Sequence, residues 1–218
     1  MISAKARACH CARSCAGGKI RTDRSMPTGS PRRACKGGKR SMERGAFRDR
    51  LDQLVRWGLK INWTLLRAGY CGKGFIPPQF TQEDIVAYAL EKLKTVEDNL
   101  VAVLAGAEND RYEFESTLNA LAKNEGASEE IQARKLRALL VFRCMETAPD
   151  DCVEGLIHWT ETWVSLGLPE DCPHIVQGRH NALSPDAYYT REMCEALKKR
   201  NADWLDQGIT YIVSRERA

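Results

Sequence analysis

The segment from residue 151 to residue 166, DCVEGLIHWTETWVSL, carries the clearest structural signal in this sequence. Its apolar side chains recur at intervals of three and four residues, which is the period of an α-helix with one buried face. They are Cys152, Leu156, Trp159, Trp163 and Leu166. Aromatic side chains at this spacing are typical of a helix that packs into a core. We therefore predict an amphipathic helix over 151–166.

The same period recurs through most of the chain beyond residue 46. It predicts helices over 47–57, 62–69, 81–93, 97–105, 111–124, 129–147, 151–166 and 191–207. Thr81 with Asp84, Ser128 and Thr190 stand where helix caps are expected. Gly208 is expected to end the last helix, and Ile209–Val213 to form a short strand or a docked extension. The predicted fold is all-α, an irregular bundle of seven to eight helices, with stacked helical hairpins as one possible arrangement.

Residues 1–45 differ sharply in composition from the rest. They are rich in Gly, Ser, Pro, Lys and Arg and almost empty of Val, Leu, Phe and Trp. Such a segment cannot bury enough apolar surface to offset the entropy of ordering it. We expect a basic disordered leader here, followed by a single helical domain over 46–218. The composition changes near Met42, so the alternative is that translation starts there and the leader is not made.

Charge is distributed unevenly along the chain. The leader holds twelve of the 33 basic residues and two of the 29 acidic residues, a net charge of +10. The remaining residues include 21 basic and 27 acidic ones, a net charge of −6. No apolar run approaches the roughly 20 residues that cross a bilayer, and no apolar core follows the N-terminal basic residues as in a secretory signal. We expect a cytoplasmic protein whose cysteines, odd in number, are buried thiols that behave as small hydrophobes.

His158 is the first candidate for chemistry. Glu154 lies one helical turn before it, and Glu161 nearly one turn after it. A histidine between carboxylates can act as a general base or as half of a metal site. The simpler interpretation is a solvated face with helix-spaced charges. We favour the simpler one, because neither a nucleophile nor a second helix bearing histidine completes a site.

A predicted loop contains a second set of candidates. Cys172, His174 and His180 carry side chains that bind zinc. Their spacings, Cys-x-His and His-x5-His, match no standard structural zinc motif, so an ordinary surface loop is favoured. We predict no resident metal or cofactor.

The leader contains its own metal-binding side chains among basic residues, namely Cys9, His10, Cys11, Cys15 and Cys35. A zinc knob that binds nucleic acid is one interpretation, because Lys and Arg contact phosphate. Paired Cys-x-x-Cys elements are missing, however. We favour an unfolded or untranslated leader, and nucleic-acid binding remains a lesser alternative.

Four basic residues lie on the predicted helix over 129–147: Arg134, Lys135, Arg137 and Arg143. They could form a ridge for an acidic partner, but a solvated face is the favoured interpretation. The sequence contains no phosphate-binding loop, dinucleotide fingerprint, nucleophile elbow or zinc-protease motif. We therefore predict a protein without enzymatic activity.

Several short segments carry a family resemblance. Residues 58–63, GLKINW, fit the pattern G-x-x-I-x-W, residues 134–136 read RKL, and residues 166–171 read LGLPED. With the segments at 85–89 and 184–189, they resemble a bacterial family known as a domain of unknown function, DUF2247, over about residues 50–205. Leu136 stands where the family has Trp, and Leu168 where it has Tyr.

The resemblance implies a small cytoplasmic bacterial protein with no defined functional residues. Proteins of this type resemble immunity proteins, which bind and neutralise a toxin delivered by neighbouring cells. The acidic body suits a basic partner such as a toxin domain. We expect a protein-binding module of this kind. The alternatives are an enzyme at His158 with Glu154 or Glu161, a metal site at His174 and His180, and nucleic-acid binding through the leader.

Overall fold

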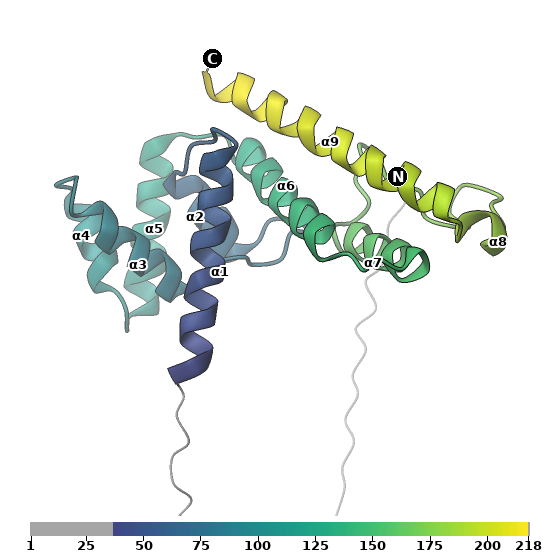
Figure 1. Ribbon diagram of the computed structural model, residues 1–218. Coiled ribbons are helices and arrows are strands. Elements are labelled where there is room, and N and C mark those ends of the chain that lie inside the picture. Colours follow the sequence, from purple (N-terminus) through teal and green to yellow (C-terminus); the bar gives the residue numbers. More distant parts are fainter. Residues whose placement is uncertain (1–36, 218) are drawn as a thin grey trace, which may run out of the picture. The chain divides into compact units, whose positions relative to one another are not determined.

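The computed structural model describes residues 37–217, which fold into helices joined by loops (Figure 1). This part of the chain contains nine α-helices and no strand, which confirms the predicted all-α fold. The leader's candidate ligands, from Cys9 to Cys35, lie outside the described residues. The helices are α1 (Gly37–Arg56), α2 (Trp63–Cys71), α3 (Gln82–Lys92), α4 (Asn99–Gly106), α5 (Arg111–Glu125), α6 (Glu129–Thr147), α7 (Cys152–Ser165), α8 (Pro185–Tyr188) and α9 (Arg191–Arg217).

Three helix starts follow the capping signals of the sequence. The Thr81 hydroxyl accepts a hydrogen bond from the Asp84 N–H at 3.2 Å, and the Asp84 carboxylate accepts one from the Thr81 N–H at 3.0 Å. Ser128 and Thr190 accept hydrogen bonds from backbone N–H groups at the starts of α6 and α9. Each cap satisfies donors that the first helical turn leaves unpaired. The predicted starts of α3, α6 and α9 are confirmed.

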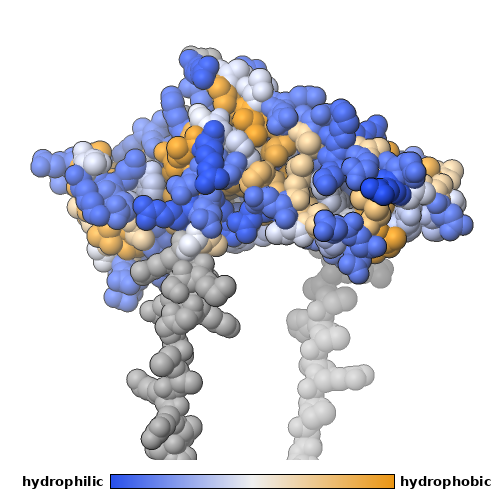
Figure 2. Space-filling model, in the orientation of Figure 1, coloured by the Kyte–Doolittle hydropathy of each residue, from blue (hydrophilic) through white to orange (hydrophobic). Residues whose placement is uncertain are grey.

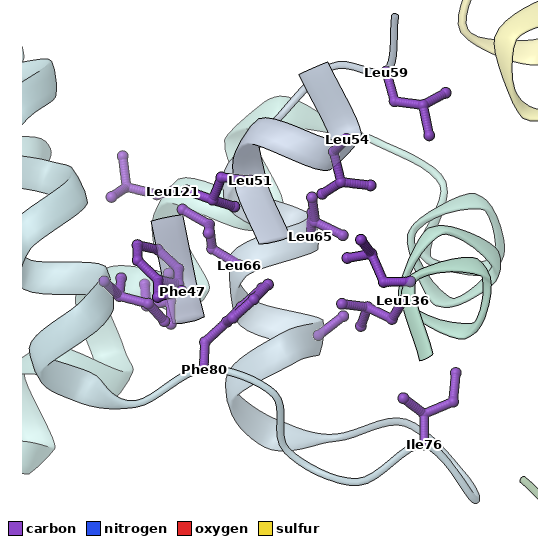
Figure 3. Packing of buried hydrophobic residues seen from close by; sticks show 14 of the residues in the cluster. Phe47, Leu51, Leu54, Leu59, Leu65, Leu66, Ile76, Phe80, Leu121 and Leu136 are labelled. Carbon is purple, nitrogen blue, oxygen red and sulfur yellow. The ribbon is translucent and has the colours of Figure 1, made fainter. Parts of the chain in front are cut away.

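The main hydrophobic core lies where α1 meets α2 and the residues just before α3. Figure 3 shows Phe47 and Leu51 of α1 close to Leu66 of α2 and to Phe80. These four side chains are at most 7% exposed. The rings of Phe47 and Phe80 meet edge to face, with centroids 5.2 Å apart. Because α1 begins at Gly37, the domain boundary that we expected at residue 45 falls inside this helix.

Helix α6 joins the N-terminal helices to the C-terminal ones. It contacts α1 and α2 as well as α7 and α9. Lys135 in α6 is completely buried, and its ammonium donates to the Lys60 carbonyl at 2.6 Å and to the Glu216 carboxylate at 2.5 Å. The Lys60 backbone N–H donates to the same carboxylate at 3.0 Å. This Lys135–Glu216 clamp ties α6, α9 and the loop after α1 together, so the solvated position predicted for Lys135 is wrong.

The end of α9 also differs from the prediction. The helix passes through Gly208 and continues to Arg217, so the expected stop at Gly208 is wrong. Residues 209–213 are part of this helix, and neither a strand nor a separate docked extension forms there. A glycine inside a helix costs only about 1 kcal/mol relative to alanine. Ile212 is 1% exposed in the main core, and Glu216 reaches Lys135 one turn later. These tertiary contacts outweigh the local preference to stop.

A smaller core holds α7, α8 and α9 together. It contains Leu156, Tyr188 and Leu197, all at most 2% exposed. The Trp163 indole donates to the buried Asn201 side chain of α9 at 2.6 Å. The described cysteines are free thiols, but the expected burial holds only for Cys144. Cys71 is exposed, and Cys152, Cys172 and Cys194 are intermediate.

Candidate functional site: the outer face of α7

Helix α7 has one buried face, as its apolar period predicts. Leu156, Trp159 and Trp163 are at most 5% exposed. Asp151 caps the helix, because its carboxylate accepts hydrogen bonds from the N–H groups of Val153 and Glu154. The buried face and the hydrogen bond from Trp163 to α9 fix how α7 is rotated, and therefore which side chains face solvent.

The opposite side of α7 combines aliphatic and acidic side chains. Val153, Ile157 and Val164 are 41%, 41% and 50% exposed. Their spacing of four and seven residues places them on one narrow stripe, and Glu154 and Glu161 lie beside it. Figure 2 shows hydrophobic atoms next to hydrophilic ones where α7 reaches the surface. We call these five residues the α7 face.

The charge around the α7 face has a single sign over a long stretch of sequence. Residues 144–178 contain no Lys or Arg. They contain seven acidic residues: Glu146, Asp150, Asp151, Glu154, Glu161, Glu170 and Asp171. Within the described part of the chain, Glu154 and Glu161 take part in no ion pair. The sequence already contained the evidence for this surface. Residues 144–178 lack Lys and Arg, and α7 has a second apolar stripe.

His158 lies beside the α7 face and is turned toward α6. Its Nε2 is 3.4 Å from the Thr147 hydroxyl, which donates to the Arg143 carbonyl at 2.8 Å. Because the Thr147 proton is used in this way, Nε2 of His158 is the donor in the contact between them. No hydrogen bond joins His158 to Glu154 or Glu161 among the described residues. The structure therefore does not form the acid–base arrangement considered for these three side chains.

His174 lies in the interior and is only 6% exposed. Its Nε2 is 2.9 Å from the Thr160 hydroxyl and 3.3 Å from the Tyr188 hydroxyl. These hydroxyls donate to the carbonyls of Leu156 and Ile175, so Nε2 of His174 must be the donor to both. Burial lowers the pKa of His174 to about 4. His174 is thus a neutral core histidine, and its Nδ1 is buried without a hydrogen-bond partner in this part of the chain.

The other candidate zinc ligands do not gather around His174. The Cys172 thiol donates to the His174 backbone carbonyl at 3.7 Å, and His180 is exposed in a left-handed turn with φ of 56°. No three His, Cys, Asp or Glu side chains in the described part are arranged to hold a metal ion. The loop is at the surface at His180, as expected, but not at His174.

The fold and the α7 face define a small all-α domain with an acidic, partly aliphatic helix surface. The chain belongs to a family described as an uncharacterized protein conserved in bacteria (DUF2247), whose model matches residues 51–209. The resemblance expected from the sequence is thereby confirmed. No curated protein and no solved structure matches the chain. Within the described residues, no helix is long and apolar enough to span a membrane.

Three of the segments that carry the family resemblance, at 58–63, 134–136 and 166–171, meet around α6. GLKINW supplies the Lys60 carbonyl and RKL supplies the ammonium of Lys135 that binds it. LGLPED supplies Asp171, whose carboxylate lies 3.5 Å from the Arg137 guanidinium of α6 and accepts from the Trp204 indole at 3.3 Å. These segments therefore hold the helices in place, which leaves the surfaces outside them as the places to look for function.

Proposed function

We propose that this protein is a cytoplasmic immunity protein that neutralises a basic toxin domain by binding it stoichiometrically through the α7 face. The observation that supports the proposal is an exposed aliphatic stripe beside two carboxylates without ion-pair partners in the described chain. Exposed apolar patches rimmed by polar groups mark contact surfaces for other proteins. The aliphatic side chains would supply buried area, and the carboxylates would select the partner's charge.

The expected partner is basic because of the charge of the sequence segment that contains this surface. Every charged residue from 144 to 178 is acidic, and the residues after the leader carry a net charge of −6. Opposite charge on two proteins speeds their encounter and disfavours acidic competitors. Glu154 and Glu161 can pair with cations of a partner without breaking an existing ion pair of the described chain. A basic enzyme that acts on nucleic acid, whose substrate is also polyanionic, has the matching chemistry.

The first experiment identifies the partner with the full chain, tagged and expressed in its native bacterium. The test variant carries Val153→Ser, Ile157→Ser and Val164→Ser. The control variant carries Leu90→Ser and Val96→Ser, which change side chains 52% and 49% exposed in α3 and just after it. We expect one stoichiometric partner of net positive charge that the control variant retains and the α7 variant loses. A partner that the α7 variant binds as well as the wild type does would contradict the proposed surface.

The second experiment separates neutralisation from mere binding. The identified partner is expressed in a sensitive cell alone, with the wild-type chain, or with the α7 variant. We expect the partner alone to stop growth, the wild-type chain to restore it, and the α7 variant to fail. A partner that is harmless by itself, or one that stays toxic while bound, would overturn the immunity function.

A further inference from the structure

A cavity of about 330 Å³ opens between α1, α6, α7 and the loop that precedes α3. Its apolar lining includes Leu139 and Leu140 of α6 and Leu166 at the end of α7. Pockets that hold small ligands usually have a volume of about 300–1,000 Å³ and combine an apolar lining with a few polar groups. This cavity is at the small end of that range. Its walls do not include the five residues of the α7 face.

Three cationic or protonatable side chains from three different helices line the cavity. Arg50 comes from α1, Arg143 from α6 and His158 from α7. No Asp or Glu is among the described residues that line it. Burial, and to a smaller extent the charge of Arg143, lower the pKa of Arg50, although the charge of Asp84 offsets part of this. The two guanidiniums therefore repel each other, and an anion between them would remove that repulsion.

Arg50 and His158 are each held in position by one contact, and the contact of Arg50 leaves its other N–H donors free. Arg50 donates through one nitrogen to the Gln79 carbonyl, and Nε2 of His158 contacts the Thr147 hydroxyl. The nearest carboxylate oxygen paired with Arg143 belongs to Glu146, at 3.9 Å, which is too far for a hydrogen bond. Each guanidinium has five N–H donors in a planar fork. Most of these donors have no acceptor among the described residues.

We propose that this cavity is a binding site for a small organic phosphate. The phosphate would lie between Arg50 and Arg143 within reach of His158, and the organic part would contact the leucines. Guanidiniums bind phosphate oxygens in pairs, through parallel N–H donors. A phosphate dianion carries the charge that neutralises both guanidiniums, whereas a carboxylate neutralises one. The inference is independent of the proposed immunity function, because the two surfaces share none of their named residues.

Calorimetry on the full chain at constant ionic strength tests the proposal with three probes: phenyl phosphate, inorganic phosphate and benzoate. We expect phenyl phosphate to bind one to one and more tightly than inorganic phosphate, because its ring reaches the leucines. We expect benzoate to bind at least tenfold more weakly than phenyl phosphate. Benzoate binding equal to that of phenyl phosphate, or no binding of phenyl phosphate at millimolar concentration, would overturn the proposal.

Matched arginine variants locate the site. Arg50→Gln and Arg143→Gln should each weaken phenyl phosphate binding at least tenfold, whereas Arg56→Gln, an equal charge change at an exposed position of α1, should not. If Arg50→Gln fails to fold, Arg143→Gln decides alone, because the Arg143 side chain is 42% exposed and its loss leaves the core intact. An equal effect of Arg143→Gln and Arg56→Gln would mean that general charge, and no defined site, attracts the phosphate. The α7 variant described above should bind phenyl phosphate normally.

Discussion

His174 shows how burial alone can decide the protonation state of a side chain. Its Nε2–H is shared between two hydroxyls, and its environment lowers its pKa to about 4 from the ordinary value of 6.5. Charging the ring would place a cation in a low-dielectric interior that offers no carboxylate partner in the described chain. The folded protein therefore excludes a proton that the unfolded chain accepts.

This difference predicts a loss of stability in mild acid. As the pH falls from about 6.5 to 4, the unfolded chain binds a proton at His174 and the folded chain does not, so unfolding becomes more favourable. A shift of this size corresponds to about 3 kcal/mol at most. Urea unfolding between pH 4 and 7.5 should show a shallower pH dependence for His174→Gln than for the wild type. His180→Asn, a change at an exposed turn, should keep the wild-type slope, and equal slopes in all three would contradict the prediction.

Close packing at Gly69 leads to a second prediction about stability at a single position. A Cβ atom at Gly69 would collide with the Phe80 ring, which is 3% exposed and packed against Phe47. We expect Gly69→Ala to lower the free energy of unfolding by about 1–3 kcal/mol through overpacking. The control is Gly208→Ala in α9, where a Cβ meets no atom within 4 Å. It should raise stability by about 0.5–1 kcal/mol through helix propensity, and denaturant unfolding should show the two opposite signs.

At the scale of whole elements, the Lys135–Glu216 clamp decides where α9 ends. Burial lowers the pKa of Lys135 despite its bond to Glu216, which shows that the ammonium is costly to bury. Removing one member of a buried ion pair leaves the other charge unpaired and typically costs about 3–5 kcal/mol. The clamp therefore couples the last turn of α9 to the stability of α6.

We predict that Glu216→Ala destabilises the protein by several kcal/mol, measured by denaturant unfolding. Asp203→Ala breaks an exposed ion pair with Lys199 in the same helix and should cost less than about 1 kcal/mol. The double variant Lys135→Met with Glu216→Leu removes both charges and should be more stable than Glu216→Ala alone. If Glu216→Ala lowers the free energy of unfolding no more than Asp203→Ala does, the clamp contributes no more to stability than an exposed ion pair.

The elements differ in how far sequence reasoning could predict them. The capping box at Thr81 and the apolar stripe of α7 are local patterns, and the structure follows both. The end of α9 was predicted wrongly, because Gly208 is a local signal to stop whereas Ile212 and Glu216 act through contacts with distant residues. Burial of Lys135 has the same origin: its acceptors come from residues 75 and 81 positions away.

The candidate site was predictable to a similar degree. Sequence reasoning placed Glu154 and Glu161 on the solvated side of α7, and the structure agrees. It could not predict that His158 would be turned toward Thr147, because that contact depends on how α6 crosses α7. The aliphatic stripe on the outer side was not predicted, because the larger side chains of the buried face dominate the apolar period of α7.

At the scale of the whole molecule, the uneven distribution of charge should act mainly on the rate at which the proposed partner associates with the α7 face. The acidic stretch from 144 to 178 would attract the proposed basic partner before contact. Dissolved salt screens this attraction beyond about 8 Å at physiological ionic strength. Aliphatic contacts act only after the two surfaces meet. The two kinds of side chain on the α7 face should therefore affect different steps of binding.

We predict that Glu154→Gln with Glu161→Gln mainly lowers the association rate of the identified partner and weakens its dependence on salt. Ile157→Ser should mainly raise the dissociation rate, because most effects of interface variants appear there. Stopped-flow measurements at several salt concentrations separate the two rates. An association rate that is unchanged by removing both carboxylates would show that the charge of the α7 face does not steer the partner.

The Lys135–Glu216 clamp has a consequence for the time during which the protein is being made. The ribosome incorporates Lys135 81 residues before Glu216. At about 5–20 residues per second, the interval between them is roughly 4–16 s. During that interval the nascent chain can form its N-terminal helices, but the ammonium of Lys135 has no carboxylate with which to enter the interior. We therefore expect the Lys135–Glu216 clamp to form only after α9 has emerged from the ribosome.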